Sequence, residues 1–212
     1  MALMYLARLT RPDILMPVSY LSTKASAPSR SDMAKVNRIV KYLAGNPNIG
    51  ITYKANSAIA PRIYADASHC THSDGKGHAG IMISLGSGVV YHRSYKLKHV
   101  TRSSSESELV TLEEASTYAK WYTLLLKELG IKLKKPLPIY QDNQSTIIIA
   151  MEGGSFKRSK HLLCKESYLK ERIDQQEIEL KFLPGNIMPA DILTKPLARP
   201  TLFRLLELIS VA

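Results

Sequence analysis

The stretch Arg62-Ile-Tyr-Ala-Asp-Ala-Ser68 decides the fold of this 212-residue chain. Its β-branched and aromatic side chains predict a strand, and Asp66 lies in the middle of that strand, where aspartate is disfavoured. A carboxylate in such apolar surroundings is costly unless a partner compensates for its charge. The stretch therefore predicts a strand that carries an acid with a specific partner.

Three more acids occupy comparable positions. Glu108 heads a long helix with an apolar stripe, Asp142 closes the predicted strand 137–141, and Asp191 lies in Pro189-Ala-Asp-Ile-Leu-Thr-Lys195. The chain contains 29 Lys and Arg against 18 Asp and Glu, a net charge of +11. Four acids at the edges of separate elements in a basic chain suggest bound divalent metal that faces a polyanion. A basic surface without such a role is the alternative.

The remaining elements follow from periodicity and turn signals. We expect helices over roughly residues 1–45, a short strand at 50–54, strands at 62–67, 79–85 and 89–95, a helix at 104–129, a strand at 137–141, helices at 143–151 and 157–174, a strand at 177–182, a short helix around 191 and a last one at 201–208. The turn Gly86-Ser87-Gly88 joins its two flanking strands into a hairpin. This order predicts an α/β fold, a mixed β-sheet flanked by helices, with an N-terminal helical annex.

Cysteine usage and the first residues bear on the compartment. Cys70 and Cys164 are far apart and form no CxxC motif, which favours a reducing compartment. The apolar start is interrupted by Arg8, Arg11 and Pro12, too soon for a signal peptide or a spanning helix. We therefore expect an intracellular protein with no membrane contact.

Helical phase separates Glu108 from Glu106. Steps of four and three residues from Glu108 reach the apolar positions 112, 115, 119, 122 and 126, so this glutamate should face the sheet. The same steps from Glu106 reach mostly polar positions and predict that Glu106 points to water. A capping box that begins at Ser103 or Ser105 would instead give either glutamate a role at the helix start. Likewise, Asp142 could be a helix N-cap, and Asp191 a surface acid near a helix start.

Several motifs occur in the order that one family shows. They are Tyr5-Leu-Ala-Arg-Leu-Thr-Arg-Pro-Asp-Ile14, Val40-Lys-Tyr-Leu-Ala-Gly45, Tyr64-Ala-Asp-Ala67, Ser103-Ser-Ser-Glu-Ser-Glu-Leu109, Gln141-Asp-Asn-Gln-Ser145, Ser159-Lys-His161 and Ala190-Asp-Ile-Leu-Thr-Lys-Pro-Leu197. Over nearly its whole length the chain resembles the C-terminal part of the Pol polyprotein of copia-type LTR retrotransposons. In that family the end of the reverse transcriptase is followed by a ribonuclease H domain.

The resemblance implies a domain organisation and an activity. Residues 1–55 are similar to the thumb or connection of reverse transcriptase, residues 62–197 to a ribonuclease H-like domain, and residues 198–212 form a C-terminal helical tail. The implied activity is endonucleolytic hydrolysis of the RNA strand of RNA/DNA hybrids. Polymerase activity is not expected, because the chain has no adjacent Asp-Asp pair.

The resemblance also implies the site residues. Asp66, Glu108, Asp142 and Asp191 would be both the catalytic residues and the ligands of two Mg²⁺ or Mn²⁺ ions, with Asp66 shared by the two ions. Hard oxygen ligands without a His or Cys cluster favour these metals over zinc. Cellular ribonucleases H carry a histidine in the loop before the last acid, whereas residues 183–190 contain none.

Basic and amide side chains near these acids are candidates for binding the nucleic acid. The candidates are Lys96, Lys98, Arg102, Asn143, Gln144, Lys157, Arg158, Lys160 and His161. Each could instead belong to a solvated face. His69 and His72 could touch substrate or simply face solvent, and Trp121 is expected to be a packing residue.

The expected partners are an RNA/DNA hybrid and, if the chain is part of a longer one, the rest of a Pol polyprotein. The expected location is the cytoplasm, in a virus-like particle if the element is active, or the nucleus. The alternative function is that of a catalytically idle nucleic-acid-binding remnant of Pol.

Overall fold

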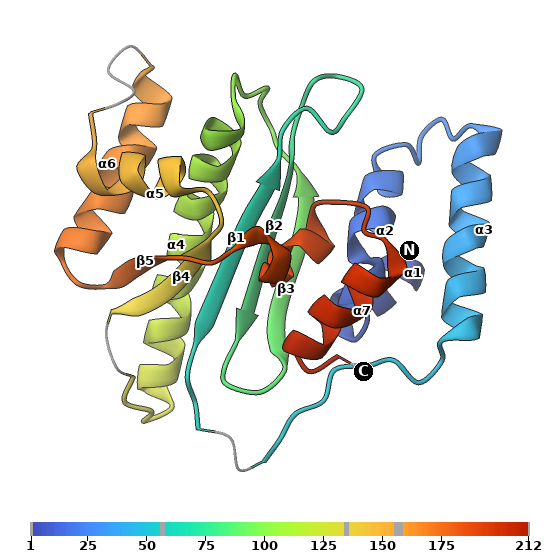
Figure 1. The fold of residues 1–212 in the computed structure, drawn as a ribbon, viewed down its shortest axis with the longest axis horizontal. Helices are drawn as coiled ribbons and strands as arrows, with labels where there is room; N and C mark the ends of the chain where they lie inside the picture. The colour runs from blue at the N-terminus through green and yellow to red at the C-terminus, as the bar shows by residue number, and fades with distance from the viewer. Residues whose placement is uncertain (1, 56–57, 134–135, 155–158, 212) are drawn as a thin grey trace.

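The computed structural model of the protein describes residues 2–55, 58–133, 136–154 and 159–211. Its centre is a five-stranded sheet with the strand order β3-β2-β1-β4-β5 (Figure 1). The strands are β1 Arg62–Ser68, β2 His78–Ser84, β3 Val89–Lys96, β4 Leu137–Gln141 and β5 Ile178–Phe182. Strand β1 is antiparallel to β2 and parallel to β4, so the sheet is mixed, as predicted.

Three helices cover one face of this sheet. They are α4 Ser104–Glu128, α5 Gln144–Glu152 and α6 Lys160–Asp174 (Figure 1). The stripe predicted on α4 is buried, and Leu112, Ala115 and Ala119 pack against Ile63 and Ile81 of the sheet. The core on this face consists mainly of apolar side chains.

The opposite face is covered by segments from both ends of the chain. These segments are α1 Ala2–Leu9, the 3₁₀ turn η1 Pro12–Ile14, α2 Leu15–Ser22, the 3₁₀ segment η3 Pro189–Leu193 and α7 Arg199–Leu208. Leu15 and Val18 of α2 share a core with Met82 of β2, Val89 of β3 and Leu205 of α7. The sheet is therefore sandwiched between two helical layers. The division into annex, domain and tail stays a prediction.

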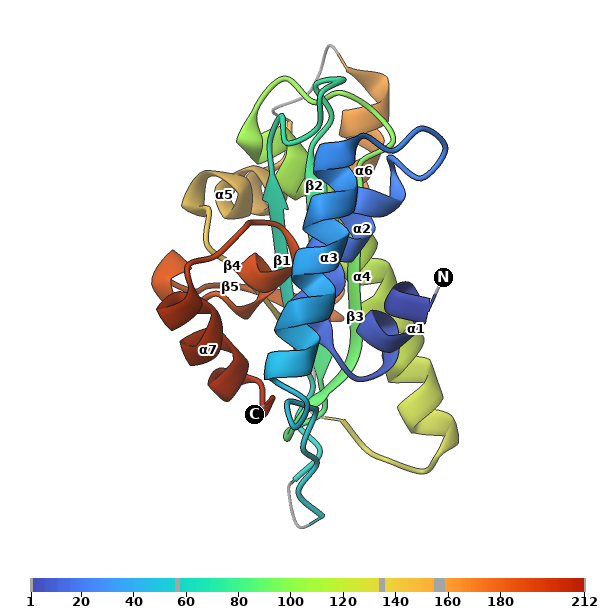
Figure 2. The same ribbon diagram turned by 90° about the vertical axis from the view of Figure 1, so that its right-hand side faces the viewer.

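Helix α3, Arg30–Gly45, is the outermost element on that side and lies over α2 (Figure 2). It begins with a capping box, in which the Ser29 side chain accepts a hydrogen bond from Asp32 N while the Asp32 carboxylate accepts one from Ser29 N. A buried ion pair between Arg11 and Asp13 (2.8 Å) holds its other end, since Arg11 Nη1 also donates to Asn46 O.

The prediction of a strand at residues 50–54 is wrong. Only Ile51 forms a β-bridge, to Val211, and Thr52 N donates to Ser210 O at 2.8 Å. Beyond it, contacts to the β2–β3 hairpin replace a ladder: Tyr53 Oη donates to Val89 O. Among the described helices, none is long and apolar enough to cross a membrane.

Candidate active site

Asp66 lies on β1 and faces the layer that contains η3. It pairs in register with Gly80 of β2 and is only 1% exposed. The hydroxyl of Thr194, directly after η3, donates a hydrogen bond to Asp66 Oδ2. A β-carbon at Gly80 would lie 2.7 Å from Leu193 Cβ and 2.8 Å from Thr194 Cγ2. Glycine at this position therefore lets the segment that holds Asp66 approach the sheet.

Glu108 lies in the second turn of α4, which begins after the N-cap Ser103. Its side chain is 6% exposed, and its Oε2 accepts a hydrogen bond of 3.0 Å from Thr146 Oγ1 in α5. The expected orientation of Glu108 toward the sheet side is thus confirmed. Thr146 fixes one carboxylate oxygen of Glu108.

Asp142 is the residue between β4 and α5. The N-cap of α5 is Asn143, whose Oδ1 accepts hydrogen bonds from Ser145 N and Thr146 N. The N-cap alternative for Asp142 is therefore wrong, and its carboxylate remains free for the site. Gly185 allows close approach, because a β-carbon there would lie 3.1 Å from Asp142 Oδ2.

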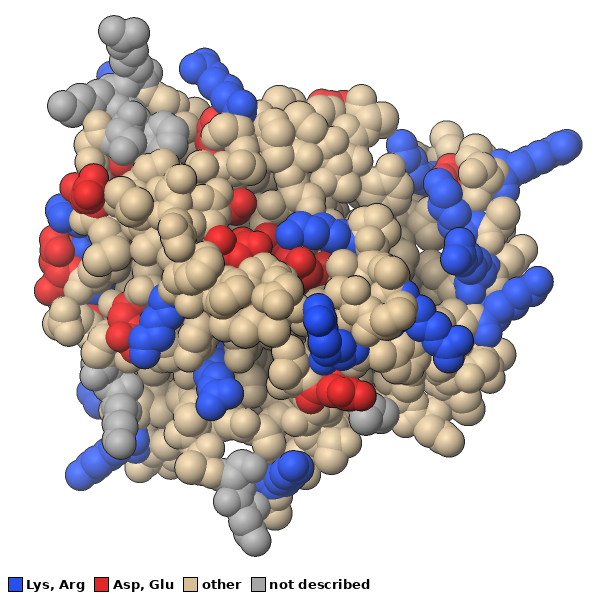
Figure 3. Space-filling model, viewed as in Figure 1, with Lys and Arg blue, Asp and Glu red and all other residues tan. Residues whose placement is uncertain are grey.

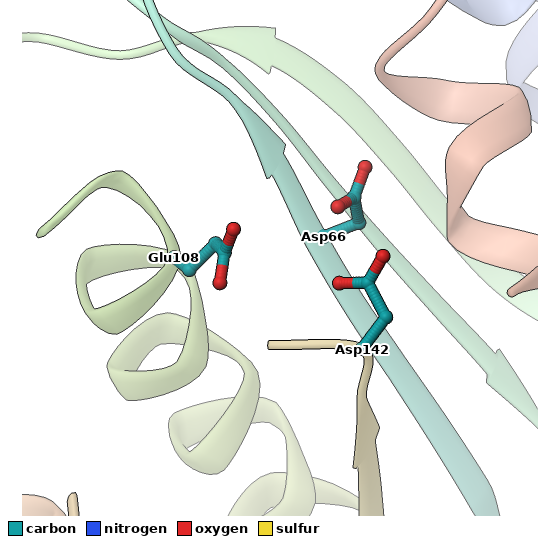
Figure 4. A group of neighbouring side chains, drawn as sticks. All are labelled: Asp66, Glu108 and Asp142. Atoms are coloured by element: carbon teal, nitrogen blue, oxygen red, sulfur yellow. The ribbon is translucent and has the colours of Figure 1, made fainter. Parts of the chain in front are cut away.

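The carboxylates of Asp66, Glu108 and Asp142 converge from three elements (Figure 4). One oxygen of each lies within 4.8 Å of the other two. Burial raises the pKa of Glu108 to about 7, and the charges of Asp66 and Asp142 add to this rise against the opposing hydrogen bond from Thr146. Burial and the charge of Asp66 also raise the pKa of Asp142. Like charges held this close favour a bound cation.

Asp191 lies in η3 at the margin of this group. Lys195 Nζ is 2.8 Å from Asp191 Oδ1 and 3.4 Å from Asp66 Oδ2, so the ammonium joins the two acids. Burial and Asp66 raise the pKa of Asp191 to about 7, and Lys195 opposes the rise. Burial would lower the pKa of Lys195, but the surrounding carboxylates raise it above its usual value.

The donor set fits a divalent cation that prefers oxygen ligands. Three carboxylates from rigid elements converge, and two of them are oriented by threonine hydroxyls. Oxygen-only sites of this kind suit ions such as Mg²⁺ or Mn²⁺ better than Zn²⁺.

Sequence reasoning missed Thr194 and Lys195 as site residues. For Lys195, the spacing of four residues from Asp191 was the available signal, since such pairs can meet on one side of a helical turn. For Thr194, a buried hydroxyl with 0% exposure, the sequence offers no local signal.

The predicted nucleic-acid-binding residues lie in different settings. Lys98, Arg102, Gln144, Lys160 and His161 are exposed. Lys96 forms a 2.7 Å ion pair with Asp74, and Asn143 uses its side chain as the N-cap. Lys157 and Arg158 lie outside the described residues. The assignment of these residues to nucleic-acid binding stays a prediction.

Three orientations expected from the sequence are wrong. Glu106 does not face water: it is 6% exposed, and its carboxylate accepts a hydrogen bond from Arg102 N beside the N-cap Ser103. His72 does not face solvent either, because it is 4% exposed and stacks on Tyr20. Trp121 is 55% exposed rather than packed. For Glu106, the hydrogen bond at the helix start determines the orientation of the side chain, which helical phase alone predicted incorrectly.

The fold and the arrangement of the site residues together define a class of protein architecture. A mixed sheet in the order β3-β2-β1-β4-β5, with helices on both faces and three carboxylates gathered beside β1, is the ribonuclease H-like architecture that the sequence predicted. No protein-family model matches the chain. Among solved structures, ribonuclease H1 of the halophilic archaeon Halobacterium salinarum NRC-1 has a TM-score of 0.46 and 14% identity, covering 64% of this chain and 94% of that one.

Curated relatives give the family. The retrovirus-related Pol polyprotein from transposon RE1 of Arabidopsis thaliana is 33% identical over 199 residues, which cover 93% of this chain. The corresponding protein from transposon RE2 of the same plant is 31% identical over 199 residues. Over 93% of its length the chain is homologous to copia-type retrovirus-related Pol polyproteins, and it spans 14% of the length of each of these two relatives.

Proposed function

We propose that the chain is a divalent-metal-dependent endoribonuclease that hydrolyses the RNA strand of RNA/DNA hybrids. The observation that carries this proposal is the convergence of Asp66, Glu108 and Asp142 within 4.8 Å. Homology to the Pol polyproteins and a net charge of +11 support a nucleic-acid substrate. Figure 3 shows acidic side chains gathered in the middle of one face, a basic side chain directly beside them, and further basic side chains over α3.

In this proposal Asp66, Glu108 and Asp142 hold the metal, Mg²⁺ or Mn²⁺, with Asp191 completing the quartet. Bound divalent ions would activate water and stabilise the leaving 3′ oxygen of the phosphodiester. The chain's own residues contribute orientation: Thr194 fixes Asp66, Thr146 fixes Glu108, and Asn143 caps α5 so that Asp142 stays free. Selectivity for RNA would rest on contacts to the 2′-hydroxyl, which DNA lacks.

The test is cleavage of a labelled RNA/DNA hybrid in Mg²⁺ or Mn²⁺ by the wild-type chain and by Asp142→Asn. We expect the substitution to abolish cleavage, because it removes one of the three converging carboxylates. Asp174→Asn is the matched control, since within the described part of the chain Asp174 makes only a 3.9 Å surface ion pair with Lys170 at the end of α6. This control should cleave like the wild type.

Two results would count against the enzyme. Equal binding of the hybrid by both proteins without cleavage by either would support the alternative, a catalytically idle nucleic-acid-binding remnant of Pol. Cleavage that survives both Asp142→Asn and chelation of divalent ions would exclude the proposed site. The cooperation of this chain with the rest of a Pol polyprotein and its location in the cell stay predictions.

A further inference from the structure

A buried polar chain crosses the layer between the sheet and α2. It consists of His72 in the loop after β1, His78 on β2, Ser94 on β3 and Ser19 on α2, and each of them is at most 8% exposed. His72 Nε2 contacts His78 Nδ1 at 3.0 Å, and His78 Nε2 contacts Ser94 Oγ at 2.7 Å. Ser19 Oγ donates to Ser94 O at 2.7 Å.

The far end of this polar chain reaches the active-site segment. Ser94 Oγ donates a 2.7 Å hydrogen bond to Leu193 O, the last residue of η3. Leu193 lies between Asp191, the fourth acid, and Thr194, whose hydroxyl binds Asp66. The carbonyl that Ser94 holds is therefore within two residues of both groups that η3 brings to the site.

The direction of every hydrogen bond in the polar chain is fixed from that end. Because the Ser94 hydroxyl donates to Leu193 O, it accepts from His78 Nε2, which must carry the proton. His78 Nδ1 then accepts a hydrogen bond from His72 Nε2–H, so that in the neutral His72 ring Nδ1 carries no proton. His72 Nδ1 is buried and has no hydrogen-bond partner among the described residues, in agreement with this assignment. The hydrogen bonds of the polar chain can therefore run in only one direction, which favours a single arrangement of its side chains.

The polar chain is anchored in the N-terminal helices at both Ser94 and His72. Ser19 contributes its hydroxyl, and the neighbouring Tyr20 ring stacks on His72 with centroids 4.9 Å apart. Lys24 Nζ, just after α2, also donates to Ser73 Oγ at 3.3 Å. Helix α2 and the residue Lys24 just after it thus contact the loop between β1 and β2 at His72 and Ser73.

We propose that Ser94 and His78 are positioning residues for the metal site, and that α2 fixes them through Ser19 and Tyr20. Partners that orient metal ligands through hydrogen bonds typically change metal affinity by about 10- to 100-fold when they are removed. This inference rests on the proposed function, because it takes Asp66 and Asp191 to be metal ligands. It assigns to the N-terminal helices a role in the geometry of the site.

The experiment measures binding of Mn²⁺ to the whole chain without nucleic acid, by isothermal titration calorimetry, for the wild type and Ser94→Ala. Ser94→Ala should weaken binding by about tenfold. Ser116→Ala is the matched control: Ser116 is a buried serine on α4, 1% exposed, whose hydroxyl donates to Glu113 O at 2.7 Å on the other face of the sheet. It should lose comparable thermal stability and keep the wild-type Mn²⁺ affinity.

Two further variants separate positioning from general damage. Ser94→Thr keeps the hydroxyl and should retain near wild-type Mn²⁺ affinity. Ser19→Ala removes the hydrogen bond to Ser94 O and should weaken Mn²⁺ binding in the same direction as Ser94→Ala, so it serves as the test if Ser94→Ala does not fold. The apparent Mg²⁺ requirement for hybrid cleavage should rise in parallel, with an unchanged KM for the hybrid. The proposal would be overturned if Ser94→Ala and Ser116→Ala lost Mn²⁺ affinity equally. It would also be overturned if Ser94→Ala, or Ser19→Ala, kept the wild-type Mn²⁺ affinity.

The proposed function can fail separately. If the wild-type chain binds no Mn²⁺, or if Asp66→Asn binds it equally well, the metal site itself is wrong. If the wild type binds Mn²⁺ through Asp66 and Ser94→Ala binds it equally well, only the positioning role is wrong.

Discussion

The two faces of the sheet are built differently. The face under α4 is packed with apolar side chains such as Ile63, Ile81 and Leu112. The face under α2 and η3 contains apolar residues too, but the polar side chains of His78, His92 and Ser94 are buried among them. The first face buries local hydrogen bonds such as that of Ser116 within α4, whereas the second holds a connected chain of polar groups from β2, β3 and α2, each of which must find its partner.

The faces also differ in where their covering segments lie in the sequence. Helices α4, α5 and α6 fall between β3 and β5, whereas the opposite layer needs α1 and α2 from before the sheet and η3 and α7 from after it. The acids of the site come from both layers: Glu108 belongs to α4 and Asp191 to η3. Assembly of the site therefore requires both layers to be in place.

The largest expected effect is that of removing residues 1–45. This deletion uncovers Met82 and Val89, which are at most 1% exposed, and leaves His92 Nε2 without its partner Ala7 O. We expect residues 46–212 to lose cooperative folding, to be measured by circular dichroism and size-exclusion chromatography. A monomeric fragment with a sharp unfolding transition would show that the annex is a separate unit, as the predicted domain division implies.

A matched pair of leucines compares the apolar packing of the two faces. Leu112 on α4 is 0% exposed and Leu15 on α2 is 1% exposed. Leu112→Ala and Leu15→Ala should each lower the free energy of unfolding by about 2–5 kcal/mol, because each leaves a cavity in a packed core. Urea unfolding monitored by fluorescence gives both values. A loss of unfolding free energy well below this range for Leu15→Ala alone would mean that the packing of α2 on the sheet contributes little to stability.

Gly80→Ala tests the close approach of η3 to β2. The added β-carbon would lie within 3 Å of Leu193 Cβ and Thr194 Cγ2, so η3 must shift away from Asp66. We expect a loss of about 1–3 kcal/mol in unfolding free energy, together with weaker Mn²⁺ binding. Gly45→Ala is the control, since nothing lies within 4 Å of a β-carbon there. Equal behaviour of the two variants would contradict the tight contact.

The smallest expected effect is the change with pH of the stability that His78 contributes on the buried polar face. Burial lowers the pKa of His78 from its usual 6.5 to about 4, and His72 contributes to this. The unfolded chain binds a proton on His78 near pH 6.5 and the folded chain only near pH 4, so stability from this group falls as pH drops through that window. Between pH 7.5 and 5.5 the stability gap between wild type and His78→Gln should narrow by about 1 kcal/mol.

Urea titrations at both pH values give the two gaps. The comparison of wild type with His78→Gln cancels the contributions of titrating groups that do not contact His78, including Glu108 and Asp191. A gap that stays constant between the two pH values would show that His78 titrates normally in the folded protein.

Much of the fold follows from local patterns in the sequence. The stripe on α4 repeats at helical spacing, and Gly86 and Gly88 mark the β2–β3 hairpin. The strand expected at 50–54 failed because an extended segment forms a strand only when a partner runs along it, and here only Val211 does. Whether a segment finds a partner strand depends on the tertiary structure, and a local sequence pattern carries no information about it.

The candidate site was predictable to a similar extent. The motifs around Asp66, Glu108 and Asp142 pointed to acids that the structure brings together. The offset of one residue between Asp142 and the true N-cap Asn143 could not be resolved, since both residue types cap helices well. The contacts of Thr194 and the burial of His72 depend on segments more than a hundred and about fifty residues away in the chain, respectively, and no spacing rule reports them.

The bridge between Ile51 and Val211 affects how the molecule would respond to force. Tension applied at the two ends of the chain passes along residues 2–51 and then directly across this bridge to Val211. Helices α1 and α2 also pack on the sheet, so tension loads the sheet through this layer as well as through the bridge. In a single-molecule pulling experiment we therefore expect the N-terminal helices and the sheet to give way in one event.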